Sequence, residues 1–472
     1  MPTTYQWRPI ANLEADPKTL TDGELAPLLR IWQTQRTEVT EGEAFEEFDR
    51  RLRREWAIET GIIENVYTLD RGVTKTLIEK GIDAALIPHD ATDRDPALVA
   101  RVIEDHLLAL EGMFHFVSGQ RQLSTSYVKE LHAALLRNQD THTVVDQFEK
   151  AFEKPLEKGE YKKVSNSPTR PDGAVHEYCP PEHVASEMDR LIEVYQKHQA
   201  SGVPPEVEAA WLHHRFSQIH PFADGNGRVA RALASLVFIR AGAFPLIVKR
   251  DDRVRYIESL EKADGRDLRP LVAMFVEAQR TALLQASEAA YTVTPLSLDQ
   301  AVAAARDRLV QRGKLPPKEW HSAKDTARSL GQFAVQRFQL VANQLIQEIG
   351  RVDKKFKFTV ASGSGNDDIR AKALREAGHV ADFAAYDQWI RLGFDTGRSE
   401  RLVVSFHGLG PRYRGIIGVV AYLVVTDLGD VPIKGDTFQI NYEEGPASTQ
   451  QRFSTWLEQV IVEGLSEWRR TL

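Results

Sequence analysis

The chain has 472 residues, 42% of them hydrophobic and 27% charged, which is the composition of an ordinary globular protein with room for about two to four domains. The formal net charge of −7 argues against a general polyanion-binding protein, so we expect no nucleic-acid partner. The single cysteine, Cys179, cannot form an internal disulfide. The N-terminus lacks a secretory-signal pattern, and the longest apolar stretch, 232–248, is interrupted by Arg240. We therefore expect a cytoplasmic protein with no membrane partner.

Helical spacing of apolar residues dominates the first two-thirds of the chain, with short polar loops between the segments. The signals for helix starts are N-capping hydroxyls and prolines at the first helical positions. The expected helices cover 95–116, begin again at Ser124 or Thr125, and then follow Pro180-Pro181 and Pro204-Pro205. The last of these helices leads directly into His220.

The segment 159–179 departs from this helical pattern. Short strands are expected at 161–164 and 175–178. Two prolines and an Asp-Gly pair lie between them, and these residues favour a turn. We therefore predict a β-hairpin over 159–179.

A domain boundary is expected near 291–298, where a stretch containing Thr, Val and Pro interrupts two helical patterns. A helical region continues to about residue 350, strands follow, and an amphipathic helix from about Gln450 closes the chain. Helices and strands in this order predict an α+β domain. Its four expected strands are 356–362, 401–407, 416–426 and 437–442.

The stretch 220–231, His-Pro-Phe-Ala-Asp-Gly-Asn-Gly-Arg-Val-Ala-Arg, has the features of a phosphate-binding turn. Gly225 and Gly227 flank Asn226 immediately before an apolar helical pattern. Glycines permit a tight turn whose backbone N–H groups converge, and a helix N-terminus attracts anions.

Four side chains of this stretch add charge and a base. Arg228 and Arg231 are three residues apart, so they project near one face of the helix and can meet two phosphates. Asp224 can hold Mg²⁺ through a carboxylate oxygen. His220 has the ordinary pKa that suits proton abstraction near neutral pH.

Every specified position of 220–231 matches His-x-Phe-x-(Asp/Glu)-Gly-Asn-Gly-Arg-x-x-Arg, the motif of the Fic family, which the chain resembles over roughly residues 60–285. The resemblance implies a mainly α protein with an all-helical Fic core, in which the hairpin 159–179 is a flap that aligns an extended target segment. Together with the helix and strand pattern of the C-terminal part, which the resemblance does not cover, it predicts three regions. They are an N-terminal helical region with an inhibitory motif (1–115), a Fic catalytic domain (116–290) and the C-terminal α+β domain (291–472), whose role stays open.

The resemblance further implies transfer of AMP from ATP to a Ser, Thr or Tyr hydroxyl of a protein target, which could be the protein itself. His220 would deprotonate the hydroxyl, Asp224 would hold Mg²⁺, and Asn226 would steady the α-phosphate. Arg228 and Arg231 would bind the β- and γ-phosphates. The residues expected to contact ATP are Gly225, Asn226, Gly227, Arg228 and Arg231.

The segment 60–65 matches the (Ser/Thr)-x-x-x-Glu-(Gly/Asn) inhibitory motif of many Fic proteins, through Thr60, Glu64 and Asn65. A carboxylate within reach of Arg231 would pair with it and occupy the place of the γ-phosphate. We therefore expect Glu64 to hold the transfer reaction in check.

Other interpretations stay open at this point. The same residues could remove AMP from a modified target, with Glu64 positioning water, or the core could be a nucleotide-binding regulator. UTP or GTP could replace ATP, because the base pocket lies outside the motif, and a homodimer is equally open. His213 and His214 point to different faces of a helix and lack an acidic partner at metalloprotease spacing, so we expect core packing and hydrogen bonding.

Overall fold

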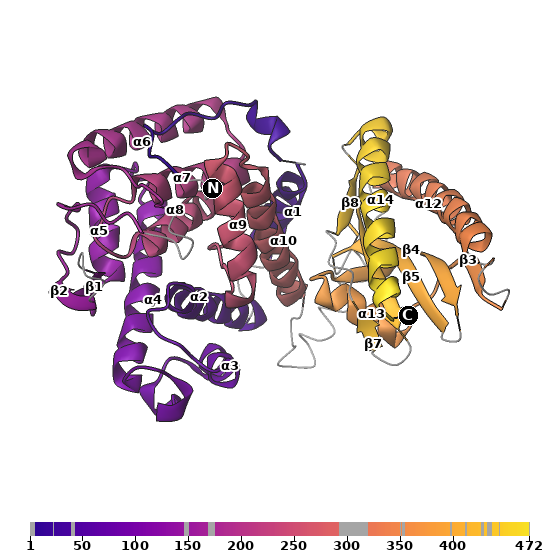
Figure 1. Cartoon of the computed structure of the whole chain (residues 1–472), viewed down its shortest axis with the longest axis horizontal. Helices are drawn as coiled ribbons and strands as arrows, with labels where there is room; N and C mark the ends of the chain where they lie inside the picture. Colours follow the sequence, from indigo (N-terminus) through magenta and orange to yellow (C-terminus); the bar gives the residue numbers. More distant parts are fainter. Residues whose placement is uncertain are drawn as a thin grey trace. The chain divides into compact units, whose positions relative to one another are not determined.

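The computed structural model describes residues 5–21, 23–38, 43–145, 151–168, 175–291, 320–349, 351, 355–396, 399–410, 413–425, 429–431, 437–442 and 444–471. The chain divides into two compact units (Figure 1). The first comprises Met1–Gln33 with Phe45–Leu283, and the second comprises Thr34–Ala44 with Leu284–Leu472.

The first unit is helical apart from one short hairpin. Its helices include α1 (Leu25–Glu38), α2 (Glu43–Ile63), α3 (Arg71–Lys80), α4 (Pro96–Ser118), α5 (Thr125–Leu135), α6 (Pro181–Ser201), α7 (Pro205–Ile219), α8 (Asn226–Arg240), α9 (Arg253–Asp264) and α10 (Arg269–Tyr291). The unit limits cross three of these helices, so residues 34–38 of α1, 43–44 of α2 and 284–291 of α10 belong to the second unit. The short 3₁₀ helices are η1 (Pro17–Thr19), η2 (Ala84–Leu86), η3 (His89–Ala91) and η4 (Arg250–Asp252). The hairpin pairs β1 (Thr141–Val145) with β2 (Ala151–Pro155).

The helix starts expected from the sequence are confirmed. Helices α4, α6 and α7 each begin on a proline, whose missing N–H is not needed in the first turn. The Ser124 hydroxyl accepts the N–H of Tyr127 at 3.2 Å and caps α5. Helices α7 and α8 are buried on nearly every side, which is the pattern of helices inside a bundle, and the segment that joins them carries the motif.

The hairpin predicted over 159–179 is wrong in its strands. Neither 161–164 nor 175–178 forms a regular strand, although the two arms approach each other where the N–H of His176 donates to Pro168 O at 3.1 Å. The turn was predicted over 165–173, and its residues 169–173 lie outside the described residues.

The backbone of these two arms is hydrogen-bonded to other parts of the chain. The N–H of Lys162 donates to Pro221 O at 2.8 Å, and the N–H of Glu177 donates to Tyr5 O at 3.0 Å. Tyr5 and His176 also form an isolated parallel bridge. These tertiary contacts replace the ladder that the local sequence predicted.

The second unit is an antiparallel sheet with helices on both faces. The strands lie in the order β3-β4-β5-β6-β7, and β8 also pairs with β6. The strands are β3 (Lys357–Gly363), β4 (Ala381–Asp395), β5 (Ser399–Leu409), β6 (Ile416–Val425), β7 (Gly429–Val431) and β8 (Phe438–Asn441). The helices are α12 (His321–Glu348), α13 (Asp368–Glu376) and α14 (Pro446–Thr471).

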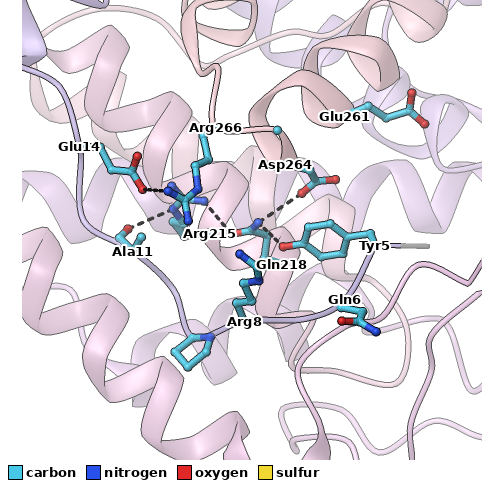
Figure 2. Close-up of a pocket in the computed structure, with 12 residues that line it drawn as sticks. Tyr5, Gln6, Arg8, Ala11, Glu14, Arg215, Gln218, Glu261, Asp264 and Arg266 are labelled. Carbon is cyan, nitrogen blue, oxygen red and sulfur yellow. Dashed lines mark hydrogen bonds and ion pairs between the residues drawn. The ribbon is translucent and has the colours of Figure 1, made fainter. Parts of the chain in front are cut away.

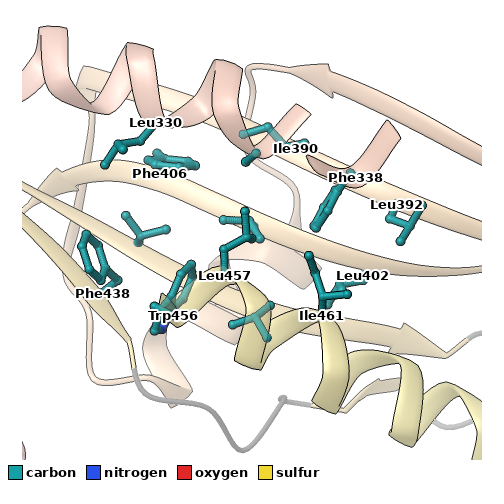
Figure 3. Packing of buried hydrophobic residues seen from close by; sticks show 14 of the residues in the cluster. Leu330, Phe338, Ile390, Leu392, Leu402, Phe406, Phe438, Trp456, Leu457 and Ile461 are labelled. Atoms are coloured by element: carbon teal, nitrogen blue, oxygen red, sulfur yellow. The ribbon is translucent and has the colours of Figure 1, made fainter. Parts of the chain in front are cut away.

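Alternate residues of β5 and β6 serve two separate cores, as the two-residue period of a strand requires. Leu402 and Phe406 of β5 pack beneath α12 and α14 (Figure 3), whereas Val403 packs on the opposite face with Leu374 of α13. Because the sheet is covered on both faces, β6 is a nearly continuous apolar run.

The four strands expected in this region correspond to β3, β5, β6 and β8, and the closing helix begins at Pro446. Thr426, the expected end of one strand, lies outside the described residues. Strand β4 was not expected, and its pairing with β5 shifts register between Asp382 and Asp387, which breaks the apolar alternation.

The sequence predicts domain limits at 115/116 and near 291–298. Helix α4 runs through the 115/116 limit, and both sides of that limit belong to the first unit. Of the boundary at 291–298, only Tyr291 lies within the described residues, at the end of α10. Among the described helices, none is long and apolar enough to cross a membrane.

Candidate active site

His220 ends α7 in the left-handed conformation, with φ of 50°. Its Nδ1 lies 3.2 Å from Ser217 O, and because a carbonyl only accepts, Nδ1 carries the proton. The imidazole Nε2 is therefore the basic nitrogen. The ring stacks on Tyr178, with centroids 3.7 Å apart and planes 3° from parallel, which fixes its orientation.

The surroundings of His220 keep its imidazole neutral. Burial and, to a smaller extent, the nearby Lys162 ammonium lower the pKa of His220 to about 3. The neutral imidazole is the form that accepts a proton. At neutral pH the Nε2 lone pair is therefore unprotonated and available to a proton.

Asn226 holds the shape of the loop after His220. Its Oδ1 accepts the N–H of Phe222 at 2.9 Å, and its Nδ2 donates to Phe222 O at 2.7 Å. Gly225 begins the following turn with φ of 77°, and a methyl group there would overlap the side chain of Leu136. The loop thus requires glycine at this position for both its conformation and its packing.

Asp224 is held as a carboxylate at the edge of the site. Its Oδ1 accepts the N–H of Gly225 at 2.7 Å, and its Oδ2 accepts Gln139 Nε2 at 2.5 Å and lies 3.3 Å from Arg228 Nη2. Burial alone would raise the pKa of Asp224, but Arg228, Gln139 and the Gly225 N–H together lower it below its ordinary value. The group is therefore ionised at neutral pH.

Arg228 and Arg231 are almost completely buried, at 2% and 1% exposure. Arg228 Nε and Nη1 and Arg231 Nε are buried and have no hydrogen-bond partner among the described residues. A buried guanidinium with unused N–H groups is costly unless an anion completes it. The first N–H groups of α8, which lack intrahelical acceptors, lie in the same turn. The site is therefore suited to a phosphate chain.

Glu64 occupies part of this anion site. Its Oε1 lies 2.6 Å from Arg231 Nη1, and Arg231 Nη2 donates to Thr60 O at 3.1 Å. A methyl group on Gly227 would overlap the Glu64 carboxylate, so that carboxylate lies directly on the first turn of α8. The pairing of Glu64 with Arg231 expected from the sequence is confirmed.

Asn65 explains how the chain places Glu64. The N–H of Asn65 donates to Ile62 O and the N–H of Val66 to Gly61 O, both at 3.0 Å, which is the Schellman pattern that ends a helix. Asn65 has φ of 53°, and asparagine tolerates this left-handed conformation. The cap stops α2 immediately before Glu64, so its carboxylate stands at the helix end.

Two buried contacts fasten α2 over the site. Trp56 Nε1 donates to Ser235 Oγ at 3.0 Å, and Ser235 in turn donates to Arg231 O at 2.8 Å. The Glu59 carboxylate accepts both the backbone N–H and the guanidinium of Arg250. Helix α2 is thereby tied to α8 and to η4.

A cavity of about 530 Å³ lies beside the end of α7 that carries His220 (Figure 2). Gln218 and Arg215 of α7 line it, together with Asp264 at the end of α9. Gln218 Nε2 donates to Asp264 Oδ1 at 3.2 Å and to Tyr5 Oη at 2.6 Å. The volume falls within the range typical of small-molecule sites.

The predicted site residues come together in the first unit, from α2, the α7–α8 loop and α8. Sequence reasoning missed His132, whose Nδ1 accepts the N–H of Gly159 at 2.8 Å and whose Nε2 donates to Asp224 O at 3.0 Å. It also missed Gln139 and Tyr178. The position of His132 beside Leu131 in a predicted helix was the only available signal, and it does not distinguish a site residue from a core residue.

The two histidines before the motif are part of the core, as expected. His213 Nε2 lies 2.7 Å from Tyr256 Oη, and His214 Nε2 lies 3.0 Å from Asp264 Oδ1. Within the described ranges, no group of three or more His, Cys, Asp or Glu side chains is arranged to hold a metal ion.

Comparison with known proteins finds similarity to members of one family. The model of the Fic/DOC family matches residues 122–238. Protein adenylyltransferase fic-1 of Caenorhabditis briggsae is 28% identical over 236 residues, which are 47% of this chain and 40% of the relative. Protein adenylyltransferase Fic of Nematostella vectensis is 30% identical over 174 residues, covering 36% of this chain and 39% of the relative.

Among solved structures, a Fic-domain-containing signalling protein from Bacteroides thetaiotaomicron is 23% identical and gives a TM-score of 0.44. The match covers 55% of this chain and 97% of that one. This chain spans about two-fifths of the length of the curated relatives named above. The motif and the family match together identify residues 122–238 as a Fic/DOC family domain.

Proposed function

We propose that this protein transfers AMP from ATP to a Ser, Thr or Tyr hydroxyl of a protein target and that Glu64 restrains the transfer. The observation that carries the proposal is the neutral imidazole of His220 beside two buried arginines with unused N–H groups. The curated relatives are named as protein adenylyltransferases, which supports the same reaction.

In this reaction, His220 Nε2 takes the proton of the target hydroxyl while the hydroxyl oxygen attacks the α-phosphorus of ATP. The bond from that phosphorus to the bridging oxygen breaks, and pyrophosphate leaves. Arg228 and Arg231 bind the β- and γ-phosphates, which directs the α-phosphorus toward the hydroxyl. The backbone N–H groups at the start of α8 steady the α-phosphate.

Asn226 keeps its predicted contact with the α-phosphate as part of this proposal. Its side chain already bonds both backbone groups of Phe222, and it is 2% exposed. We therefore assign it first to the shape of the loop that presents the N–H groups. One Nδ2 hydrogen is left for the phosphate, because each hydrogen bond uses one of the two.

Magnesium fits the residues present through Asp224. Its carboxylate is ionised and its side chain is 38% exposed, so it can reach a ligand. One carboxylate with phosphate oxygens and water is the usual magnesium arrangement in nucleotide sites. Mg²⁺ would supply charge neutralisation for the leaving pyrophosphate.

The cavity beside α7 suits the nucleoside of the donor. Gln218, two residues before His220, lines the cavity, and the carboxylate of Asp264 can accept a hydrogen bond from an amino group of a base. Adenine has such a group in its exocyclic amine, so this carboxylate is suited to ATP as the donor.

Glu64 restrains transfer by holding Arg231, the group proposed to bind the γ-phosphate. While this ion pair persists, ATP lacks one of its two arginine contacts and its α-phosphorus is not directed toward the hydroxyl. Release of Glu64 would restore the contact. The same carboxylate could position a water molecule for removal of AMP, so the direction of the reaction is decided by the experiment below.

The test compares wild type, Glu64→Gly and Glu64→Gly/His220→Ala, incubated with α-labelled ATP and Mg²⁺. We expect label on the protein only in Glu64→Gly. Wild type retains the restraint, and the double variant lacks the general base, whose loss lowers the rate by a factor of about 10²–10⁴. Equal label in wild type and Glu64→Gly would refute the restraint, and label in the double variant would refute the base. No label despite measured ATP binding would favour AMP removal or a regulator.

A further inference from the structure

The N-terminal segment Tyr5–Glu14 is fixed across α6 and α7. The N–H of Ile10 donates to Glu187 Oε2 at 2.6 Å, and Ala11 O accepts both Trp211 Nε1 and Arg215 Nε at 3.1 Å. Ile10 is 2% exposed. The segment is thus a built part of the first unit, although it lies about two hundred residues from the motif in the sequence.

This segment supplies six of the twelve residues that line the cavity. In Figure 2 it runs from Tyr5 on the right, below Arg215 and Gln218, to Ala11 and Glu14 on the left. Its salt bridge from Glu14 to Arg266, at 3.3 Å, links it to the turn after α9. The residues that it contributes are Tyr5, Gln6, Arg8, Pro9, Ala11 and Glu14.

Tyr5 and Arg8 are planar groups of the kind that hold nucleic-acid bases. The Tyr5 ring stacks on His176 with centroids 4.5 Å apart, and the Arg8 guanidinium forms no hydrogen bond or ion pair with the residues that the structure describes. Arginine and aromatic faces bind bases by stacking. Asp264, which also lines the cavity, has a second carboxylate oxygen, Oδ2, that can accept a hydrogen bond from the edge of a base.

The charge of the cavity also indicates a nucleoside rather than a phosphate. Its three arginines are matched by three carboxylates, so it offers no excess positive charge. Arg215 and Arg266 are already engaged with protein oxygens, whereas the buried guanidiniums of Arg228 and Arg231 provide the unmatched positive charge. A donor nucleotide would therefore place its phosphates on α8 and its neutral part in the cavity.

Successive contacts between aromatic rings lead from Tyr5, which lines the cavity, to His220, the proposed general base. Tyr5 stacks on His176, His176 meets Tyr178 edge to face at 5.1 Å, and Tyr178 stacks on His220. Ligand contact at Tyr5 is thus only two rings from the proposed catalytic imidazole.

We propose that residues 5–14 form part of the donor site and that Tyr5 and Arg8 hold the nucleoside of the nucleotide. This inference rests on the proposed function. It assigns recognition of the donor to a segment outside the motif and outside residues 122–238.

The experiment measures binding calorimetrically with the full chain carrying Glu64→Gly, which frees Arg231. Arg8→Ala and Tyr5→Ala are each compared with Lys18→Ala, an exposed residue of the same N-terminal region outside the cavity. ATP and inorganic triphosphate are the probes. We expect Arg8→Ala and Tyr5→Ala to weaken ATP about tenfold, as loss of one stacking contact does, and to leave triphosphate binding unchanged. Tyr5→Phe keeps the ring and should retain ATP affinity.

The outcomes separate this inference from the proposed function. If the parent protein binds ATP and both alanine variants bind it equally well, the role of residues 5–14 is refuted while the proposed function stands. If the alanine variants weaken triphosphate as much as ATP, the segment does not contact the nucleoside and the inference fails. If the parent binds no ATP at all, the proposed function fails and the inference fails with it.

Discussion

The Glu64 carboxylate and the γ-phosphate of ATP should compete for Arg231, and this competition can be measured. The perturbations are Glu64→Gly, which removes the side chain, and Glu64→Gln, which keeps its size and removes its charge. Arg231 has 1% of its side chain exposed and Glu64 has 27%, so solvent screens the ion pair only from the side of Glu64. A hydrogen bond between charged groups of this kind contributes about 1.5–3 kcal/mol.

Two effects of opposite sign follow from that magnitude. Without nucleotide, Glu64→Gly leaves Arg231 buried without its carboxylate, so the free energy of unfolding should fall by about 1.5–3 kcal/mol. With ATP, the γ-phosphate replaces the carboxylate and no pair must be broken first. The affinity for ATP should therefore rise about tenfold or more, at about 1.4 kcal/mol for each factor of ten. For Glu64→Gln, which keeps one neutral acceptor, both the stability and the affinity for ATP should lie between those of wild type and Glu64→Gly.

Chemical denaturation with and without ATP measures the first effect, and titration calorimetry measures the second. A ligand that binds only the folded state adds stability according to its affinity, so ATP should stabilise Glu64→Gly more than wild type. The reasoning is refuted if Glu64→Gly is as stable as wild type without ATP and binds ATP no more tightly. A stability loss without an affinity gain would mean that Glu64 and the γ-phosphate do not share a place.

Three other predictions follow from single contacts. Gly227→Ala should lower the unfolding free energy by about 1–3 kcal/mol, because its methyl group overlaps the Glu64 carboxylate. In a Glu64→Gly background most of that loss should disappear, and chemical denaturation measures both values. Because burial lowers the pKa of His220 to about 3, its base form is lost only as pH falls through that value. The labelling rate of Glu64→Gly should therefore stay level between about pH 5 and 8, and a fall near the ordinary histidine pKa would contradict this. Ser235→Ala leaves the Trp56 indole N–H without its partner, so the unfolding free energy measured by denaturation should fall by about 1–3 kcal/mol. The change should also loosen α2 and raise the labelling rate. Unchanged labelling would mean that this hydrogen bond does not contribute to the restraint by Glu64.

Short-range features of this fold could be predicted because their causes lie within a few residues. Ser124 caps the helix that it precedes, and Pro181 and Pro205 begin theirs. The glycines and arginines of 220–231 could be assigned to a phosphate site for the same reason, since one turn of helix brings them together.

Contacts between distant segments limited the prediction of secondary structure. The arms of 159–179 have turn residues and strand formers, but Lys162 bonds Pro221 and Glu177 bonds Tyr5, so no ladder forms in the described residues. A hairpin is marginal by itself and yields to such contacts. The sequence contains no local sign of which partner a free N–H will find.

The sequence by itself determined the motif, the helices around it and four strands of the second unit, because capping, turn chemistry and runs of apolar residues act over short stretches of chain. Only the tertiary structure decided which polar groups are buried and paired. Arg231 meets Glu64 across 167 residues, and Tyr5 meets Gln218 across 213. The neutral state of His220 likewise depends on burial by segments far from it in the sequence. Desolvation is a property of the assembled core, and it sets both the unused N–H groups of the arginines and the basicity of the imidazole.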